Sequence, residues 1–354
     1  MVGVVALCLV GLEGVSRLLL LLSDARRARK VPPLSKLAVY RDVPWAADYW
    51  REWQQAVRLP ERMRYTGDGI LHLEPFRGTA INIDSSGRRR TTHVDCRAGA
   101  LQIAMFGGSM LWGHGADDEH TIPSLIARRF ENDGHSACIT NDAEWGSTTS
   151  RGIIELLREL EQRQQRPNVV IFYSGSYDVK ETIFGNEMDN WLRSKPEGEF
   201  AIQKLLSRLR ARQPGEFRLA AADVARVRLL TVARFSASHR TIEALASEYH
   251  FLPVIVWHPY ILASHKALSP DERATVDAFD QNFPTMAAAI RETYASMKAW
   301  HGRDFYDLSD ALDGRHELLY IDAGHLAPAG NAIIADRIYE ILSHQRVDAT
   351  HPAR

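Results

Sequence analysis

Three residues of this chain have the types and spacing of a serine nucleophile with its base. Ser109 follows two glycines at the end of the apolar run LQIAMF, and Asp322 and His325 lie three residues apart in a loop. A carboxylate at that spacing accepts from one imidazole nitrogen, which fixes the tautomer and leaves the other nitrogen free as a base. Because a serine hydroxyl is a poor nucleophile until a base takes its proton, the three residues predict nucleophilic catalysis. The alternative is a serine that only closes a tight Gly-Gly turn.

Small and polar residues also follow the other expected strands. The stretch NDAEWG, residues 141–146, follows one strand, SGSYD, residues 174–178, ends another, and His258 ends a third. In open parallel sheets, ligands bind beyond the carboxyl ends of the strands, so we expect these stretches to meet Ser109 at one edge. The predicted substrate-pocket residues are Gly108, Asn141, Trp145 and Asp178. Simpler alternatives are a turn glycine at Gly146, a helix N-cap at Asp178 and a structural role for His258.

The elements that must position these residues alternate along the chain from residue 101 onward. The predicted strands are residues 101–106, 136–140, 168–173, 252–259 and 304–309. The predicted helices are residues 121–130, 150–162, 271–300 and 331–342. Apolar runs followed by amphipathic helices predict a mainly parallel sheet covered on both faces. We therefore predict a three-layer α/β/α fold with five strands.

The chain divides into three parts in this interpretation. Residues 1–22 form an apolar segment, residues 23–98 a linker and N-terminal extension, and residues 99–345 the main domain. Residues 180–236 are charged and interrupt the alternation, so we predict a helical insertion there. Within the extension, YRDVPWAADYWREWQQAV predicts a short aromatic helix.

The apolar segment is close to the roughly 20 residues needed to cross a bilayer. Glu13 and Arg17 interrupt it, but they lie four residues apart and can pair on one helix face. We predict an uncleaved, single-pass membrane anchor, with an amphipathic or buried helix as the alternative. Basic residues at positions 26–30 follow the segment, and this pattern would place the main domain in the cytoplasm. A start codon assigned too far downstream would produce the same pattern.

Composition restricts the partners. The formal net charge of -1 gives no indication of nucleic-acid binding. Three cysteines are too few for a disulfide framework, and because Cys8 lies in the apolar segment, Cys96 and Cys138 are the only conceivable pair. No CxxC motif or Cys/His cluster indicates a metal, so we predict neither a metal nor a cofactor.

Three motifs together resemble the SGNH/GDSL-type hydrolases, a lipase- and esterase-like family with a flavodoxin-like three-layer fold. The motifs are FGGSMLWG, NDAEWGSTTS and IDAGHLAPAGNAII, and the similarity runs over residues 75–342. The resemblance implies Ser109 as nucleophile, His325 as base, Asp322 as its orienting carboxylate, and a Gly146 N–H that binds the oxyanion.

A narrower resemblance is to the membrane-tethered bacterial members of the family. It is carried by FGGSMLWGHGADDEHTIPSLIA and RPNVVIFYSGSYDV. The substrate class that it implies is an ester or acylated carbohydrate, such as O-acetyl groups on cell-surface glycans. It also implies an extracytoplasmic hydrolase domain, the cytoplasmic face being the alternative.

The sequence departs from the family pattern at two positions. GGS replaces the commoner GDS, and Tyr177 stands where the family has an oxyanion-binding asparagine. Loss of one such donor typically lowers the rate about 100- to 1,000-fold, and a tyrosine O–H reaches about 4 Å farther than an amide. Two hypotheses follow: a carboxyl-ester hydrolase, or a catalytically degenerate protein that binds glycan or serves in polysaccharide assembly.

Overall fold

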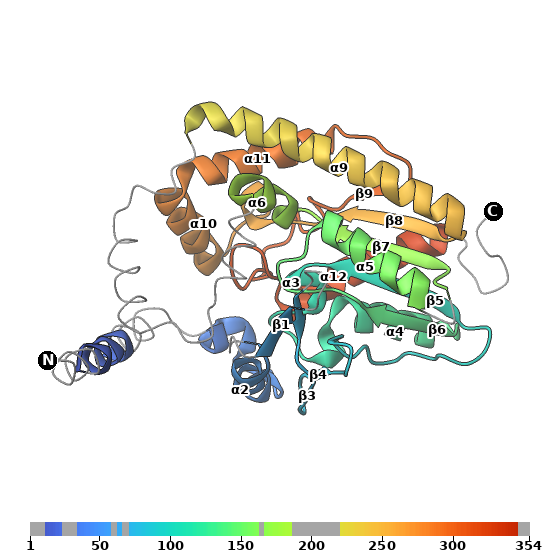
Figure 1. Cartoon of the computed structure of the whole chain (residues 1–354), viewed down its shortest axis with the longest axis horizontal. Coiled ribbons are helices and arrows are strands. Elements are labelled where there is room, and N and C mark those ends of the chain that lie inside the picture. Colours follow the sequence, from blue (N-terminus) through green and yellow to red (C-terminus); the bar gives the residue numbers. More distant parts are fainter. Residues whose placement is uncertain are drawn as a thin grey trace, which may run out of the picture.

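A parallel five-stranded sheet forms the centre of the molecule (Figure 1). The computed structural model describes residues 11–22, 34–57, 62–65, 71–162, 166–185 and 220–345. In spatial order the strands are β6 (Ala137–Asn141), β5 (Leu101–Gly107), β7 (Val169–Ser174), β8 (Leu252–Trp257) and β9 (Phe305–Asp307). All four neighbouring pairs are parallel. The predicted α/β fold with five parallel strands is confirmed.

Two groups of helices cover the sheet. The helices of the main domain are α3 (Ser109–Trp112), α4 (Ile122–Asn132), α5 (Thr149–Gln162), α6 (Ser176–Phe184), α9 (Ala221–Tyr249), α10 (Pro270–Asn282), α11 (Pro284–Lys298) and α12 (Pro328–His344), with short 3-10 turns η4 (Asp118–His120) and η5 (Ile261–Ala263). Helix α4 contacts α12, whereas α5, α6 and α11 contact α9. The chain steps from β5 outward to β6 and then back across to β7, so right-handed crossovers place α4 and α5 on opposite faces.

Local sequence explains where these elements begin and end. All six residues of β7 are buried, as expected for a strand covered on both faces. Helix α4 begins after Thr121, whose hydroxyl accepts a hydrogen bond from Ser124 N at 3.3 Å, and Pro123 lies in its first turn. Helix α10 begins with a capping box between Ser269 and Glu272.

The N-terminal extension folds against the loop that follows α3. It contains η1 (Leu34–Lys36), η2 (Ala38–Tyr40), α2 (Ala46–Ala56) and two antiparallel strand pairs, β1 (Met63–Tyr65) with β2 (Leu71–Leu73) and β3 (Phe76–Arg77) with β4 (Asn82–Ile83). Tyr40 Oη donates to Gly115 O at 2.6 Å, and Tyr49 Oη accepts from Gly115 N at 2.7 Å. The predicted aromatic helix is therefore present as α2, and its side chains join the core of the main domain.

The predicted anchor and insertion are only partly described. Residues 11–22 are helical, and Arg17 Nε donates to Glu13 Oε1 at 3.0 Å. Among the described residues, no helix combines the length and apolar character that a membrane span requires. Residues 1–10 and the basic stretch at 26–30 lie outside the described residues. The predicted helical insertion, residues 180–236, is described only at its two ends, which belong to α6 and α9. Its residues 186–219 lie outside the described residues.

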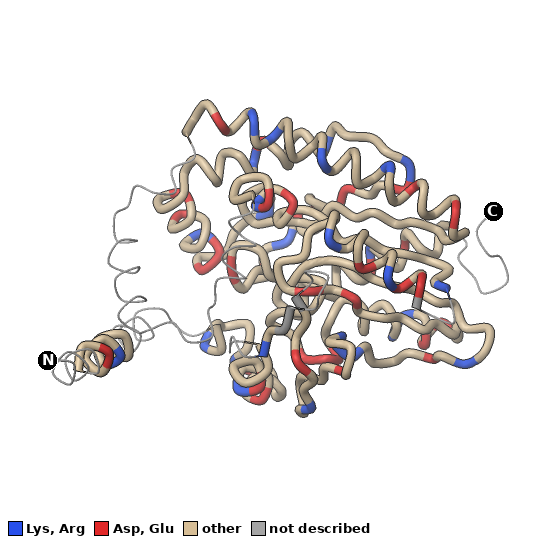
Figure 2. Tube along the Cα trace, viewed as in Figure 1, with Lys and Arg blue, Asp and Glu red and all other residues tan. Residues whose placement is uncertain are grey.

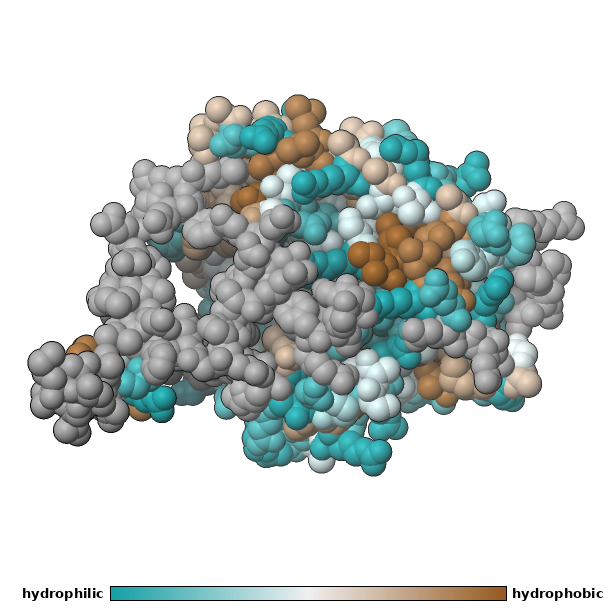
Figure 3. Space-filling view, viewed as in Figure 1, coloured by the Kyte–Doolittle hydropathy of each residue, from teal (hydrophilic) through white to brown (hydrophobic). Residues whose placement is uncertain are grey.

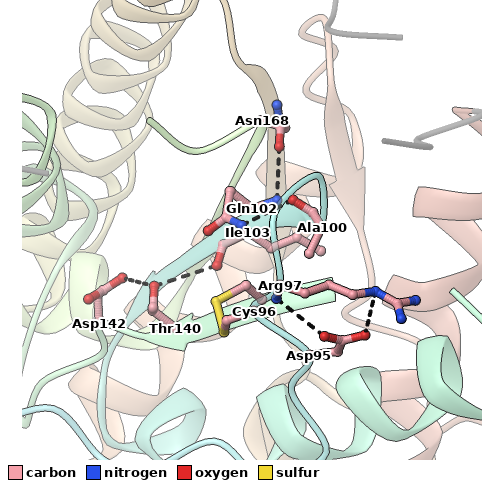
Figure 4. The surroundings of a disulfide bond; sticks show 10 residues. Asp95, Cys96, Arg97, Ala100, Gln102, Ile103, Thr140, Asp142 and Asn168 are labelled. Atoms are coloured by element: carbon pink, nitrogen blue, oxygen red, sulfur yellow. Dashed lines mark hydrogen bonds and ion pairs between the residues drawn. A yellow bond between two sulfur atoms is a disulfide. The ribbon is translucent and has the colours of Figure 1, made fainter. Parts of the chain in front are cut away.

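A disulfide joins Cys96, which precedes β5, to Cys138 in β6 (Figure 4). The two Cα atoms are 4.5 Å apart, and Asp95 N donates to Ala137 O at 2.9 Å beside them. The two cysteines that the sequence left as the only conceivable pair are bonded in the structure.

Acidic and basic residues are interspersed along the longer helices of the main domain (Figure 2). Apolar side chains are exposed over α5 and α9 (Figure 3), where Ile154 is 46% and Leu229 59% exposed. No single-sign charged face dominates this view of the molecule.

Candidate active site

The structure brings Ser109, His325 and Asp322 into one hydrogen-bonded chain. Ser109 lies at the first position of α3, directly beyond the carboxyl end of β5, and its side chain is buried. Ser109 Oγ and His325 Nε2 are 2.7 Å apart, and His325 Nδ1 and Asp322 Oδ2 are also 2.7 Å apart. With the Nδ1 proton donated to the carboxylate, Nε2 is left to accept from the serine hydroxyl.

The loop that carries Asp322 and His325 is folded by the carboxylate itself. Asp322 Oδ1 accepts from Gly324 N and from His325 N, both at 2.8 Å. Burial alone would raise the pKa of the Asp322 carboxyl, but the His325 ring and its hydrogen bonds outweigh burial and hold the pKa below its usual range. The carboxylate therefore stays ionised and fixes the imidazole.

A buried ion pair binds the backbone that leads into the loop of Asp322 and His325. Glu272 Oε1 accepts from Leu319 N at 2.9 Å and from Tyr320 N at 3.1 Å, just before Asp322. Lys266 Nζ donates to Glu272 Oε2 at 2.7 Å, and both side chains are fully buried. Sequence reasoning missed Glu272, because nothing near residue 272 indicates that it binds the backbone of Leu319, 47 residues away.

The turn that contains Gly146 docks on the end of β5. Glu144 N donates to Gly107 O at 2.9 Å, and Ser147 N donates to Glu144 O at 3.2 Å. Gly146 has a φ of 70°, a left-handed backbone that favours glycine. The N–H of Ser109 belongs to the first helical turn and has no intrahelical acceptor.

The Tyr177 side chain reaches Ser109. Its hydroxyl lies 3.3 Å from Ser109 Oγ, and its ring lies against Gly108. A Cβ atom at Gly108 would stand 3.0 Å from Tyr177 Cδ2, so the absent side chain leaves the space that the ring occupies. Of the predicted pocket residues, Gly108 thus lies beside Ser109, and its lack of a side chain makes room for the Tyr177 ring.

No protein-family model and no curated protein matches the chain. Among solved structures, a member of the lipolytic protein G-D-S-L family from Veillonella parvula is 14% identical, with a TM-score of 0.39 over 69% of this chain and 99% of the other. A lipase/acylhydrolase from Enterococcus faecalis is 14% identical, with a TM-score of 0.36 over 72% and 99% of the two chains. An acetyl xylan esterase is 12% identical, with a TM-score of 0.37 over 68% and 100%.

Asp178 and Asn141, two predicted pocket residues, make hydrogen bonds to the backbone of neighbouring segments. Asp178 Oδ2 accepts from Gly175 N and its Oδ1 from Thr149 N, both at 3.0 Å. Gly175 occupies the N-cap position of α6, so Asp178 is the third helical residue and not the cap that the simpler alternative expected. Asn141 is buried, and its side-chain amide donates to Leu111 O at 3.4 Å.

His258 supports the turn that presents Tyr177. Ser176 N donates to His258 Nε2 at 3.1 Å, and His258 Nδ1 donates to Pro259 O at 2.9 Å. Burial lowers the pKa of His258 to about 3, which keeps the ring neutral. A Cβ at Gly175 would meet the His258 ring at 2.6 Å, so a glycine is required at that position. This is the structural role that was the simpler alternative for His258.

Aromatic rings surround His325, and the sequence predicted only one of them as a site residue. The predicted pocket residue Trp145 lies with its ring centroid 6.2 Å from that of His325. His114 lies closer, with a centroid distance of 4.4 Å, and Trp53 of α2 contacts His114 at 5.2 Å. Burial and the charge of His325 hold the pKa of His114 well below its ordinary value. The available signals were the motifs WREW and GHG, but the sequence does not reveal that they meet.

One group among the described residues has the ligand types of a metal site. Nitrogen or oxygen atoms of His114, Asp322 and His325 all lie within 4.8 Å of one another. Asp322 and His325 are already hydrogen-bonded to each other, and His325 to Ser109. A metal at this position would therefore compete with the serine chain.

Proposed function

We propose that the chain is a serine hydrolase of carboxyl esters that belongs to the SGNH/GDSL-type hydrolases. The observation that carries the proposal is the continuous hydrogen-bonded chain from Ser109 through His325 to Asp322, with two contacts of 2.7 Å. This arrangement, together with Asp322 held in its ionised form, meets the geometric requirements of an activated serine.

The reaction follows from the positions of these atoms. Ser109 Oγ bonds to the carbonyl carbon while His325 Nε2 takes the hydroxyl proton, and the carbonyl electron pair moves onto oxygen. Collapse of the tetrahedral intermediate breaks the bond to the alcohol, which leaves with the proton from Nε2. Water then repeats the sequence on the acyl-serine and releases the carboxylic acid. The backbone N–H groups of Ser109 and Gly146 and the Tyr177 O–H are the proposed donors to the oxyanion.

A fluorophosphonate probe tests the proposal, because it reacts with an activated serine and not with an ordinary one. We expect the wild type to be labelled at Ser109 and the Ser109→Ala variant to remain unlabelled. Ser343→Ala, which removes an exposed hydroxyl on α12, is the matched control and should label normally. Absence of labelling in the wild type, with normal folding, would contradict the hydrolase assignment.

The second candidate is the degenerate glycan-binding protein, and the Tyr177 hydroxyl 3.3 Å from Ser109 Oγ favours it. In that case the tyrosine fills the place of the substrate carbonyl. Tyr177→Asn then separates the two candidates. If Tyr177→Asn is labelled at Ser109 and the wild type is not, the wild-type protein binds glycan without hydrolysing an ester.

We place the hydrolase domain outside the cytoplasm, with O-acetyl groups on cell-surface glycans as the substrate class. The Cys96–Cys138 disulfide supports this placement, since disulfides persist in oxidising compartments. Residues 11–22 expose several apolar side chains, including Leu18 at 57% and Leu21 at 68%, which supports attachment to a membrane. The test is a reporter enzyme, fused to the C-terminus, that works only in the cytoplasm. Reporter activity in cells would overturn the placement.

A further inference from the structure

The three residues after α3, Gly113, His114 and Gly115, form a loop that we call the GHG loop. Its two glycines have φ values of 100° and 90°, a left-handed backbone that favours glycine. His114 N donates to Ser109 O at 3.0 Å, and the centroid of the His114 ring lies 4.4 Å from that of the His325 ring. The loop therefore turns back on α3 and brings the His114 side chain against His325.

Side chains of the N-terminal extension hold the GHG loop by its backbone. Gly115 O accepts from Tyr40 Oη at 2.6 Å, and Gly115 N donates to Tyr49 Oη at 2.7 Å. Gly113 O accepts from Arg89 Nη1 at 2.7 Å. All three side chains are buried, which strengthens these hydrogen bonds. The loop thus takes its shape from residues that lie 24 to 75 positions earlier in the chain.

The Arg89 guanidinium is itself fixed on several sides. Its Nε donates to Asp118 Oδ1 at 3.0 Å, and its Nη2 donates to Ala116 O at 2.6 Å. The guanidinium carbon lies 4.3 Å from the centre of the Trp112 ring. Because a planar guanidinium bonds only along fixed directions, these contacts define its orientation. Arg89 therefore binds Gly113 O from a defined position.

The His114 ring is enclosed and neutral. The ring centroids of Trp50, Trp53 and Trp145 lie 5.6, 5.2 and 5.0 Å from that of His114. Burial and then the charge of His325 hold the pKa of His114 well below its ordinary value. A neutral ring does not repel the imidazolium that His325 becomes when it takes a proton. Nδ1 of His114 makes no hydrogen bond to any described residue, so the contact with His325 is one of ring against ring.

The contacts that hold His325 change during ester hydrolysis. Before acylation the ring is bound at both nitrogens, by Ser109 Oγ and by Asp322 Oδ2, each at 2.7 Å. In the acyl-serine, Oγ carries the acyl group in place of its proton and no longer donates to Nε2. The imidazole is then held by Asp322 and by its ring contacts. Of the described rings against His325, His114 is nearer than Trp145, at 4.4 Å against 6.2 Å.

We propose that His114 is a positioning residue for hydrolysis of the acyl-serine, the step in which Ser109 no longer holds His325. This inference rests on the proposed function and concerns the second half of its reaction. The ring contact keeps Nε2 directed at the acyl-serine, so that the water it activates lies within reach of the carbonyl carbon. Water gives its proton to Nε2 and its oxygen to that carbon. The bond from the carbon to Ser109 Oγ then breaks as Oγ takes the proton back.

Stopped-flow kinetics on p-nitrophenyl acetate separate the two halves of the reaction, because acylation releases nitrophenol in a burst and deacylation sets the steady rate that follows. We expect His114→Ala to lower the deacylation rate constant about tenfold, the size of one strong aromatic contact, and the acylation rate constant less than about twofold. Once deacylation limits turnover, kcat and KM fall together. His114→Phe, which keeps a ring, should retain most of the wild-type deacylation rate.

His239→Ala is the matched control. It removes a buried histidine of α9 whose ring centroid lies 4.9 Å from that of Trp300, and it should leave the ratio of the two rate constants unchanged. Tyr49→Phe removes the hydroxyl that binds Gly115 N and keeps the His114 ring, so it tests the same contact if His114→Ala does not fold. It should also slow deacylation more than acylation.

Equal loss in both rate constants, in His114→Ala or in Tyr49→Phe, would show that these residues only maintain the fold and would overturn the proposal. An unchanged deacylation rate, or a loss in His114→Phe as large as in His114→Ala, would overturn it as well. In a wild type that hydrolyses the ester, these results leave the proposed function intact. A folded wild type that neither releases nitrophenol nor reacts with the fluorophosphonate probe rejects the proposed function and this inference with it.

Discussion

The hydroxyl groups of Ser109 and Tyr177 are close enough to share a hydrogen bond, at 3.3 Å. The position of Tyr177 decides whether a substrate carbonyl finds a donor or an obstacle. Lys180 Nζ lies 5.0 Å from the centre of the Tyr177 ring, and the ring also rests on Gly108, so it is held on two sides. The Tyr177 side chain therefore has a fixed position beside Ser109.

Replacement of Tyr177 by Phe removes the O–H and keeps the ring. If the hydroxyl donates to the oxyanion, kcat should fall about 100-fold, while KM changes little, because the donor acts on the charge that develops in the transition state. Steady-state kinetics on an acetyl ester measure this. Tyr306→Phe, which loses a bond to Gln345 far from Ser109, is the control. A rise in kcat for Tyr177→Phe would instead show that the hydroxyl blocks the site.

At the scale of the elements, two segments hold loops of the site that lie 47 and 82 residues away from them in the sequence. Helix α10 supplies Glu272 to the loop of Asp322 and His325, and the end of β8 supplies His258 to the turn of Tyr177. Both side chains are buried and bind backbone N–H groups. They position functional residues without contact to Ser109 Oγ among the described hydrogen bonds.

Truncation of Glu272 should destabilise the protein strongly. Glu272→Ala leaves Lys266 as a buried ammonium group without its counter-charge and removes the acceptor of three backbone N–H groups. Breaking a buried pair from one side costs about 3–5 kcal/mol, which urea unfolding at pH 7 measures. Glu340→Ala, which breaks an exposed pair with Arg337, should change the unfolding free energy by less than about 1 kcal/mol. Similar values for the two variants would contradict the buried-pair argument.

The neutral His258 predicts a loss of stability in acid. Its pKa of about 3 in the folded chain lies below the unfolded value of about 6.5. The unfolded state therefore binds a proton at a higher pH, and this contribution to stability is lost as pH falls from about 6.5 toward 3. We expect the unfolding free energy of the wild type to fall between pH 7 and pH 4.5. His258→Asn should show a shallower dependence over that range, whereas His265→Asn, with its exposed side chain, should keep the wild-type slope.

At the scale of the whole molecule, local sequence patterns predicted the strands and helices. They did not predict which residues distant in the sequence contact each other. The apolar runs of β5, β7 and β8 predicted their strands because a strand buried on both faces needs a continuous apolar segment, as β7 shows. Helix α2 was predicted as an element, but its docking beside His325 depends on Glu52 and Tyr49 meeting residues 27 to 66 positions away. Spacing in the sequence carries no signal for such contacts. His114 was missed for the same reason.

The disulfide makes a prediction about the whole fold. Cys96 and Cys138 enclose a segment that contains β5, Ser109 and α4, with a sequence separation of 42 residues. Replacing both by Ala should lower the unfolding free energy by about 2–4 kcal/mol, mainly because the unfolded chain gains freedom. Thermal unfolding with and without a reductant measures this. The wild type should be sensitive to the reductant and the double variant insensitive; equal sensitivity of the two proteins would contradict a structural disulfide.

The contact between Gly108 and the Tyr177 ring couples the residue types that the two positions can hold. Gly108 has a φ of -88°, which any residue adopts, so the backbone does not demand a glycine there. The demand comes from the ring, since a side chain at position 108 would crowd it at 3.0 Å. An aspartate at position 108 would therefore fit only if the Tyr177 ring moved, and a smaller side chain at position 177 would remove that conflict. The residue that is tolerated at each of the two positions depends on the residue at the other.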